Sequence, residues 1–292
     1  MTTEQQGQDV DWSQEAEHLI RSLRRDEHWL AEAAAVLTPG RRTLLDYGCG
    51  AGGMAIALAE AAPDATVIGV DGEPVLIEVA RRAAAERGGP AADNRYERIR
   101  FEDGRDTLAA VIGTRPDLIW ASAVVHHIPD QQGAVDDMAA LLAPGGRIAL
   151  SEGGLPMRFL PWDLGLGRPG LESRMEDAQH ARLVALRAGL PGTVPMPYGW
   201  QDVLRRAGLV DVTSRSFLMD RQAPPGSRAM GDVLHTLGHQ AADLTESGLL
   251  DAEDAEVWRR LLDEDGPHWL GRRTDVYQLT ARVVHFGDRG EG

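Results

Sequence analysis

Residues Leu44–Gly53 read LLDYGCGAGG, and no other stretch of the 292-residue chain says more about its structure. A short apolar run ends at Asp46, a turn rich in glycine follows, and the next segment, MAIALAEAA, favours a helix. Glycine lets the backbone adopt positive φ angles and approach a ligand closely. The N-terminus of a helix offers free N–H groups to polar or anionic atoms. We therefore predict a strand, a glycine turn and a helix that together bind a cofactor.

Composition and charge limit the class of protein. The chain is 43% hydrophobic and long enough for one large domain with a full core, with or without insertions. No run of about eighteen apolar residues occurs, so we expect no membrane span and no membrane partner. The polar, acidic N-terminus is not typical of a signal peptide. The net charge of -15 disfavours a nucleic-acid substrate, because binding phosphates needs a basic surface.

Cysteine and arginine usage add two expectations. The single cysteine, Cys49, cannot form an internal disulfide or a zinc cluster, so we predict a cytoplasmic protein. We find no metal-binding cluster in the sequence and predict no metal cofactor. All 30 basic residues are Arg, which indicates a GC-rich bacterial genome and carries no information on mechanism.

Apolar runs and helix-forming segments alternate along the first half of the chain. We predict helices at residues 13–37, 52–61, 73–87 and 131–142, with a loop at residues 88–94. We predict strands at residues 43–47, 66–71, 96–103, 118–123 and 146–152. Strands separated by helices of this length predict an α/β fold with a parallel sheet and right-handed crossovers.

This alternation stops after Glu152. We predict helices at residues 171–188 and 199–207 and strands at residues 210–219 and 274–286. The domains expected are an N-terminal helical cap (1–40), a cofactor-binding core (41–152), a substrate-lid insertion (153–200) and the C-terminal part of the sheet (201–292). A largely helical insertion at residues 223–271 either completes the lid or forms the contact of a homodimer, and the sequence leaves both open.

Asp71 ends the second predicted strand, in the segment GVDGEP. It lies about twenty residues beyond the glycine turn, where a carboxylate can bind both hydroxyls of a ribose. Both NAD and S-adenosylmethionine carry such a ribose. The alternative is that Asp71 only caps the following helix, because Glu73 and Pro74 come directly after it. The upstream glycine turn favours ribose binding.

Five motifs in order now define a resemblance. They are LLDYGCGAGG, GVDGEP, FEDGRD, DLIWASAVVHHIPD and LLAPGGRIALSE. Together they resemble class I S-adenosylmethionine-dependent methyltransferases of the small-molecule branch, including the ubiquinone/menaquinone-biosynthesis type. The resemblance covers residues 44–152 and implies a Rossmann-like, mostly parallel seven-stranded sheet with helices on both faces, to which helical lid insertions are added. NAD dehydrogenases do not share the later motifs, so the resemblance implies S-adenosyl-L-methionine as the cofactor.

The resemblance also implies roles for residues at the carboxyl ends of the strands. The methionine part of the cofactor would be lined by Asp46, Gly48 and Gly50. The ribose would be held by Asp71, with Gly72 and Glu73 beside it. The adenine amino group would donate to Asp103, next to Gly104. The backbone of Ser122 and Ala123 would lie near the sulfonium. For Asp103 and Ser122 the alternative is turn chemistry alone.

Methyl transfer to a hydroxyl needs alignment behind the methyl carbon and is helped by a general base. His126 and His127 follow the fourth predicted strand, and histidine suits proton transfer at neutral pH. Glu152, which ends the fifth strand, is a further candidate. The alternative is that the histidines are structural. His180, among charged neighbours on a predicted helix, is expected to face solvent, and Cys49 is expected to fill space in the turn.

Apolar residues of the predicted lid suggest an organic substrate. Phe159, Trp162 and Tyr198 are candidate substrate-binding residues, because large apolar side chains can wall such an acceptor. The alternative is that they only cover the core. We predict a methyltransferase that acts on a small, largely apolar molecule in natural-product tailoring, on oxygen first, then carbon, then nitrogen. Two other functions stay open: a non-methylating cyclisation or elimination on the same fold, and a non-catalytic cofactor-binding module.

Overall fold

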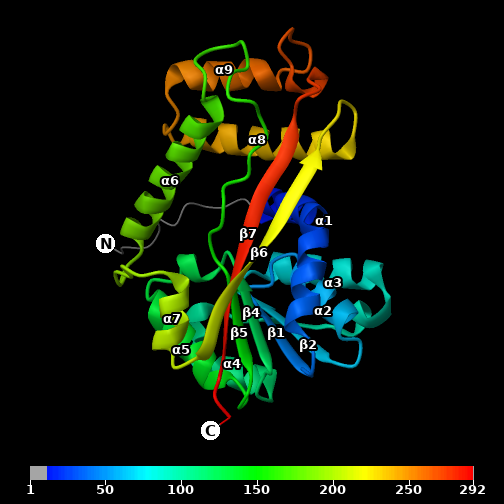
Figure 1. Cartoon of the computed structure of the whole chain (residues 1–292), viewed down its shortest axis with the longest axis vertical. Coiled ribbons are helices and arrows are strands. Elements are labelled where there is room, and N and C mark those ends of the chain that lie inside the picture. Colours follow the sequence, from blue (N-terminus) through cyan, green and yellow to red (C-terminus); the bar gives the residue numbers. More distant parts are fainter. Residues whose placement is uncertain (1–11, 292) are drawn as a thin grey trace, which may run out of the picture. The chain divides into compact units, whose positions relative to one another are not determined.

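The structure, a computed structural model, describes residues 12–291 (Figure 1). Residues 1–11 lie outside the described residues. They include the N-terminus on which the signal-peptide prediction rests and the first part of the predicted N-terminal helical cap (1–40). Two compact units divide the chain, the first ending at Trp120 and the second beginning at Ala121. This boundary falls inside a strand, and the four-part domain division stays a prediction.

The first unit alternates helices and strands from the glycine turn onward. Its elements are α1 (Trp12–Leu37), β1 (Thr43–Tyr47), α2 (Gly53–Ala61), β2 (Thr66–Asp71), α3 (Pro74–Arg87), η1 (Gly89–Asp93), β3 (Arg95–Arg98), η2 (Phe101–Asp103) and α4 (Gly104–Ile112). β1 and β2 are buried along nearly their whole length, which is why each reads as a continuous apolar run. α2 is buried from Met54 to Ala59, and its small residues let it lie close to its neighbours.

Gly52, at the N-terminus of α2, shows why the turn is built of glycine. Its φ of 82° lies in the left-handed region, which side chains rarely adopt. A Cβ added there would come within 3.0 Å of the Ala80 Cβ and 3.1 Å of the Tyr96 hydroxyl. Both the backbone angle and the close approach of α3 therefore exclude a larger residue.

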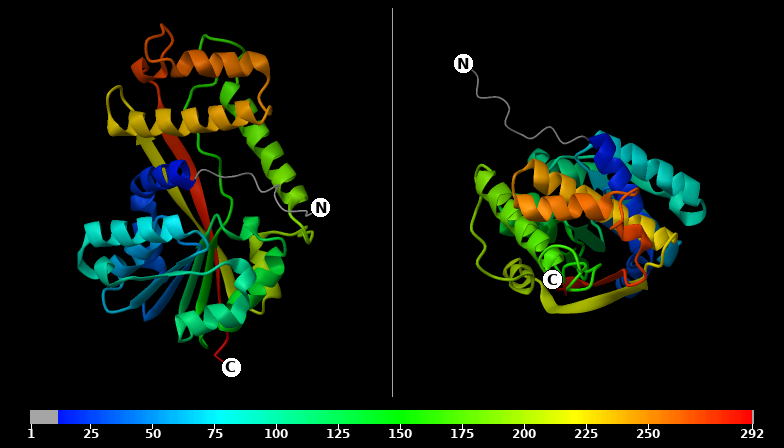
Figure 2. Two further views of the ribbon diagram at one scale, coloured as in Figure 1. Left: turned by 180° about the vertical axis from the view of Figure 1, so that it is seen from behind. Right: turned by 90° about the horizontal axis from the view of Figure 1, so that it is seen from above.

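The second unit carries the remaining helices and strands. Its elements after β4 (Leu118–Ser122) are η3 (Val125–His127), α5 (Gln131–Leu141), β5 (Arg147–Ser151), α6 (Leu171–Gly189), α7 (Trp200–Arg206), β6 (Val210–Gln222), α8 (Arg228–Glu246), α9 (Ala252–Leu262), η4 (Leu270–Arg272) and β7 (Tyr277–Asp288). β6 and β7 form a long antiparallel ribbon that runs up to α8 (Figure 1). In Figures 1 and 2, α8 and α9 lie side by side at the end of this ribbon.

A second hydrophobic core fills the helical part of this unit. It joins α6, α8, α9 and the segment before α6, and it contains Phe159, Leu171, Met175, Leu237 and Trp258. Leu171, Met175 and Ala178 are spaced by three or four residues and so face this core from one side of α6. The predicted insertions at residues 153–200 and 223–271 thus share one core. We call these two insertions together the helical cap, which is distinct from the predicted N-terminal cap at residues 1–40.

Strand pairing within the described residues gives a seven-stranded sheet of order β3-β2-β1-β4-β5-β7-β6. β1 and β3 both pair with β2 in parallel, and β7 pairs antiparallel with β5 and β6. The sheet is mostly parallel with helices around it, which confirms the predicted Rossmann-like α/β class. None of the described helices combines the length and apolar character needed to cross a membrane.

Several predicted boundaries need correction. The strand predicted at residues 96–103 ends at Arg98, because residues 101–103 turn into η2 before Gly104, whose φ is 79°. The helix α4 that follows was not predicted. The loop predicted at residues 88–94 contains the short helix η1. β6 extends three residues beyond its predicted end at residue 219, because β7 pairs with it as far as Gln222.

Candidate active site

Asp46, the residue before the last of β1, carries a buried carboxyl group. Its Oδ2 accepts a hydrogen bond of 2.9 Å from the N–H of Ala55, in the first turn of α2. Burial raises the pKa of this carboxyl from 3.8 to about 7, and the nearby Asp71 adds to the rise against the effect of the Ala55 N–H. The group therefore lies near its midpoint at neutral pH, and a cation placed beside it would draw it into the charged form.

Asp71 ends β2 and ties two segments together. Its Oδ2 accepts from the N–H of Gly50 and its Oδ1 from the N–H of Glu73, both at 3.0 Å. The N-cap of α3 is Glu73, so Asp71 is not the capping residue that the alternative interpretation required. The carboxylate instead links the glycine turn to the segment that contains Gly72 and Glu73, and it is only partly buried.

Two backbone N–H groups of the glycine turn form hydrogen bonds within the first unit. The N–H groups of Gly48 and Cys49 donate to the carbonyl oxygen of Val70 at 2.8 and 2.9 Å. Gly48 and Gly50 have φ angles of 73° and 51°. Burial, followed by the charges of Asp46 and Asp71, raises the pKa of the Cys49 thiol well above its ordinary value. Cys49 therefore stays protonated and is unsuited to act as a nucleophile.

Asp103 and Gly104 lie at the junction of η2 and α4. The Oδ2 of Asp103 accepts from the N–H of Arg100 at 2.9 Å, so this carboxylate stabilises the turn that contains it. The adenine-binding role of Asp103 stays a prediction. Beside this turn, the rings of Tyr47 and Phe101 pack at 5.3 Å between centroids. The sequence did not reveal this pair, because Phe101 falls inside the strand predicted at residues 96–103.

In the second unit, Glu152 organises the turn that carries both histidines. Its side chain is 1% exposed. Its Oε1 accepts from the N–H groups of Val124 and Val125 at 2.8 and 2.7 Å. Its Oε2 lies 2.7 Å from the Nδ1 of His126. Both carboxylate oxygens are thus engaged, which suits Glu152 to orient His126 more than to take a proton from a substrate.

The turn before the histidines is strained. Ala123, which follows Ser122, has a φ of 53°, in the left-handed region that disfavours a residue with a Cβ. Its N–H donates to the carbonyl oxygen of Ser151 at 3.1 Å. Strain of this kind persists only where the surroundings enforce it, and it clusters at functional sites. The predicted contact of Ser122 and Ala123 with the sulfonium stays a prediction.

His126 and His127 lie against each other, with ring centroids 4.1 Å apart. When the Nδ1–H of His126 donates to Glu152, its Nε2 carries the free lone pair. Burial lowers the pKa of His127, and the charges of His126 and Arg187 lower it further, while Glu152 acts in the opposite direction. His127 is therefore neutral at pH 7. The structure brings His126, His127 and Glu152 into one cluster.

The three predicted substrate-binding residues contact different elements. Phe159 is 2% exposed inside the core of the helical cap, which accounts for its apolar side chain without a ligand. Trp162 is 69% exposed and its ring lies over Gly170. The Tyr198 hydroxyl donates to Gln132 at 3.1 Å, and Arg206 stacks on its ring. Their substrate-binding role stays a prediction. His180 is exposed on α6, as predicted.

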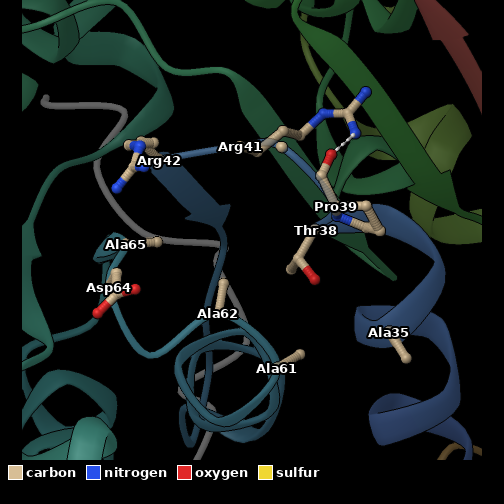
Figure 3. A pocket seen from close by; sticks show the side chains of 10 residues that line it. Ala35, Thr38, Pro39, Arg41, Arg42, Ala61, Ala62, Asp64 and Ala65 are labelled. Carbon is tan, nitrogen blue, oxygen red and sulfur yellow. Dashed lines mark hydrogen bonds between the residues drawn. The ribbon is translucent and has the colours of Figure 1, made fainter.

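An open pocket of about 410 Å³ lies in the first unit, among the end of α1, the end of α2 and the segments before β1 and β2 (Figure 3). Its wall includes Arg41, whose guanidinium donates to the carbonyl oxygens of Leu37, Pro39 and Asp117. None of the predicted site residues lines it. It lies at the amino ends of β1 and β2, whereas ligands of such sheets bind at the carboxyl ends, where Asp46 and Asp71 lie.

Removing the Asp71 carboxylate is expected to weaken cofactor binding. Loss of partners for two ribose hydroxyls costs about 1–3 kcal/mol, so Asp71→Ala should raise the dissociation constant of S-adenosylhomocysteine by about tenfold or more. The loss should be equal for 5′-methylthioadenosine, which retains the ribose. Calorimetry measures both, with Asp64→Ala, an exposed aspartate of the preceding loop, as the control. An unchanged dissociation constant in Asp71→Ala would mean that Asp71 only holds the backbone and does not bind the ribose.

Asp46→Asn tests the buried carboxyl. Asparagine can still accept from the Ala55 N–H but carries no charge. Because the folded pKa is about 7 and the ordinary value is 3.8, the wild type loses stability as the pH rises between these values. The slope is about 1.4 kcal/mol per pH unit. Urea unfolding should therefore show Asp46→Asn to be more stable than the wild type above pH 7, with the difference shrinking toward pH 4.

The same variant should bind S-adenosylhomocysteine more weakly, because the amino group of the cofactor loses its charged partner. Its affinity for 5′-methylthioadenosine, which lacks the amino-acid part, should not change. Equal losses for the two ligands would place Asp46 away from the amino-acid part.

Comparison with known proteins agrees with this geometry. Residues 45–148 match the family described as "Methyltransferase domain". The chain is 31% identical over 198 residues to a nocamycin O-methyltransferase of Saccharothrix syringae, covering 64% of this chain and 66% of that protein. It is 33% identical over 144 residues to a ubiquinone biosynthesis O-methyltransferase of Bordetella avium, covering 48% and 54%. The chain thus spans about half to two thirds of the length of these relatives.

A solved structure supports the fold. An O-methyltransferase family protein from Burkholderia thailandensis superposes with a TM-score of 0.50 at 16% identity, over 92% of this chain and 57% of that one. The domain match, the relatives and the strand order agree with the motif order in the sequence. The chain belongs to the class I S-adenosylmethionine-dependent methyltransferases. The cofactor of this class is S-adenosyl-L-methionine, as predicted.

Proposed function

We propose that the protein transfers the methyl group of S-adenosylmethionine to an oxygen of a small, largely apolar organic acceptor. The observation that carries this proposal is the pair of His126 and Glu152. A carboxylate that holds the Nδ1–H of an imidazole leaves Nε2 free to take a proton and stabilises the imidazolium that forms. Carbon and then nitrogen are the next acceptor atoms.

The donor set of the first unit fits the cofactor. Asp46 is a buried carboxyl whose ionisation a cationic amino group would favour, and it lies beside the glycine turn. Asp71 presents a partly exposed carboxylate of the kind that binds a ribose diol. We propose that Gly48 and Gly50 line the methionine part with Asp46, that Gly72 and Glu73 flank the ribose, and that Asp103 and Gly104 bind the adenine. The bound cofactor supplies a methyl group on a sulfonium, which is already a good leaving group.

The residues of the second unit would handle the acceptor proton. His126 Nε2 takes the hydroxyl proton as the oxygen attacks, and Glu152 stabilises the resulting charge. His127 is uncharged, so its imidazole adds no positive charge that would oppose protonation of His126. A positioned base of this kind contributes typically about 10²–10⁴-fold to the rate.

The acceptor class is also a proposal. A relative named for a natural product, nocamycin, supports a natural-product tailoring role, and the helical cap supplies large apolar side chains such as Trp162. Trp162 is exposed whereas Phe159 is buried, and Tyr198 is bonded to Gln132, so Trp162 is the first of the three to test. The cytoplasmic location and the homodimer stay predictions from the sequence.

The test uses S-adenosylmethionine with a labelled methyl group and a panel of acceptors: a phenol, a catechol, a hydroxylated polyketide and trans-aconitate. Mass spectrometry should find one product that has gained a methyl group, with an equal amount of S-adenosylhomocysteine. A product with the mass of its substrate would support the cyclisation alternative. Binding of S-adenosylhomocysteine without turnover of any acceptor would support the non-catalytic module.

A further inference from the structure

Arg187, near the C-terminal end of α6, binds the backbone of the segment His126–Pro129. Its Nη1 donates to the carbonyl oxygens of His126 at 3.0 Å and Ile128 at 2.6 Å. Its Nη2 donates to the carbonyl oxygen of Pro129 at 3.3 Å. One side chain of the helical cap thus holds three carbonyl groups of the segment that carries both histidines.

The segment after α6 adds a further contact. The N–H of Val194 donates to the carbonyl oxygen of Pro129 at 3.1 Å. The hydroxyl of Thr193 in turn donates to the carbonyl oxygen of Arg187 at 2.9 Å. The end of α6 and the turn at residues 190–194 therefore form hydrogen bonds to the His126–Pro129 segment. Glu152, at the end of β5, forms hydrogen bonds to Val124, Val125 and His126.

Arginine is suited to this task. Its guanidinium presents five N–H donors in a fixed planar fork and is always charged, so it can hold several carbonyl groups at once. Lysine offers the same charge without that fork. Other arginines of α6 bind elsewhere: Arg174 pairs with Asp254 of α9, and Arg182 pairs with Asp243 of α8.

Four factors act on His127 from the elements packed around it. Burial lowers its pKa, as do the charges of His126 on η3 and Arg187 on α6, while Glu152 at the end of β5 raises it. Among these, only Arg187 comes from the helical cap. Loss of Arg187, or departure of α6, would remove a positive charge and admit water, and both changes raise this pKa.

We propose that Arg187 is a positioning residue that couples the helical cap to the catalytic turn, setting both imidazoles for proton transfer while α6 is docked. This inference rests on the proposed function of His126 as the base. Release of α6, for example to exchange substrate and product, would free the His126–Pro129 segment and raise the pKa of His127.

The test is a histidine titration by NMR on the full chain without cofactor or acceptor, in which the His127 signal is assigned from its loss in His127→Gln. Arg187→Ala should raise the titration midpoint of His127. Arg187→Lys keeps the charge and should leave it nearer to the wild type. Arg182→Ala removes another arginine of the same helix and should leave it unchanged.

A second readout is methyl transfer to the acceptor found in the panel above. Arg187→Ala should lower kcat by about tenfold or more, a part of the 10²–10⁴-fold that a base contributes, with the KM for S-adenosylmethionine unchanged. Arg187→Lys should lose less. A His127 midpoint that does not move in Arg187→Ala, or that moves equally in Arg182→Ala, overturns the proposal. If no acceptor is methylated, the proposed function fails while the titration still decides whether Arg187 positions the pair.

Discussion

His126→Ala is expected to slow methyl transfer by about 10²–10⁴-fold, the usual contribution of a positioned general base. Binding of S-adenosylhomocysteine should not change, because His126 is not among the residues predicted to hold the cofactor. Part of the loss should be recovered at higher pH, where a hydroxyl acceptor ionises without help. Steady-state kinetics as a function of pH, with the acceptor found in the panel, measures both effects.

Two variants sharpen this experiment. Glu152→Gln keeps an oxygen that can accept from the Val124 and Val125 N–H groups, but its amide nitrogen cannot accept the Nδ1–H of His126. It should therefore reduce turnover without unfolding the turn. His180→Ala, on the exposed face of α6, is the matched control and should behave like the wild type. Near-normal turnover in His126→Ala would make the histidine structural and leave alignment alone to drive transfer.

Gly50→Val should abolish cofactor binding. The φ of Gly50 is 51°, which a β-branched residue cannot adopt without strain. Its N–H also donates to Asp71, so a shift of the backbone would disturb the proposed ribose site. We expect the dissociation constant of S-adenosylhomocysteine to rise by about 100-fold or more, which corresponds to the upper end of the roughly 1–3 kcal/mol of a single lost contact or to a larger loss. Calorimetry measures the binding.

Gly113→Val is the control for Gly50→Val, because it separates the effect of backbone strain from the loss of cofactor binding. Gly113 ends α4 with a φ of 75°, and a Cβ added there meets nothing within 4 Å. This variant carries similar backbone strain in open space, so it should lose stability but bind S-adenosylhomocysteine normally. Thermal unfolding of both variants shows the cost of the strain. Normal binding by folded Gly50→Val would mean that the cofactor lies elsewhere.

Much of the first unit was predictable because its signals are local. The strands at residues 43–47 and 66–71 match β1 and β2, and α2 and α3 begin within one residue of their predicted starts. Each strand is a buried apolar run with an aspartate at or next to its last residue, and a turn or helix start follows it. The wrong predictions in this unit also have local causes. Residues 101–103 read as a strand by their alternation, but the Asp103 carboxylate folds them into a turn.

The sequence predicted individual residues of the candidate site but not the contacts between them. The sequence named His126 and Glu152 separately as bases, and the structure shows one holding the other across 26 residues. It named Phe159 as a substrate contact, which stays a prediction, and only the structure shows that this side chain lies in the core of the helical cap. Arg187 carried no signal, because an arginine late in a helix is ordinary until its partners are known.

By itself, the sequence determined the class of the protein, the order of the strands and helices at residues 43–87, and the glycine turn at residues 48–53. These depend on residue type and on neighbours a few positions away, through apolar runs and backbone angles open only to glycine. Only the tertiary structure decided which polar groups meet. Glu152 with His126, and Arg187 with the carbonyl groups of residues 126–129, depend on how segments 26 to 61 residues apart pack together, which no local pattern encodes.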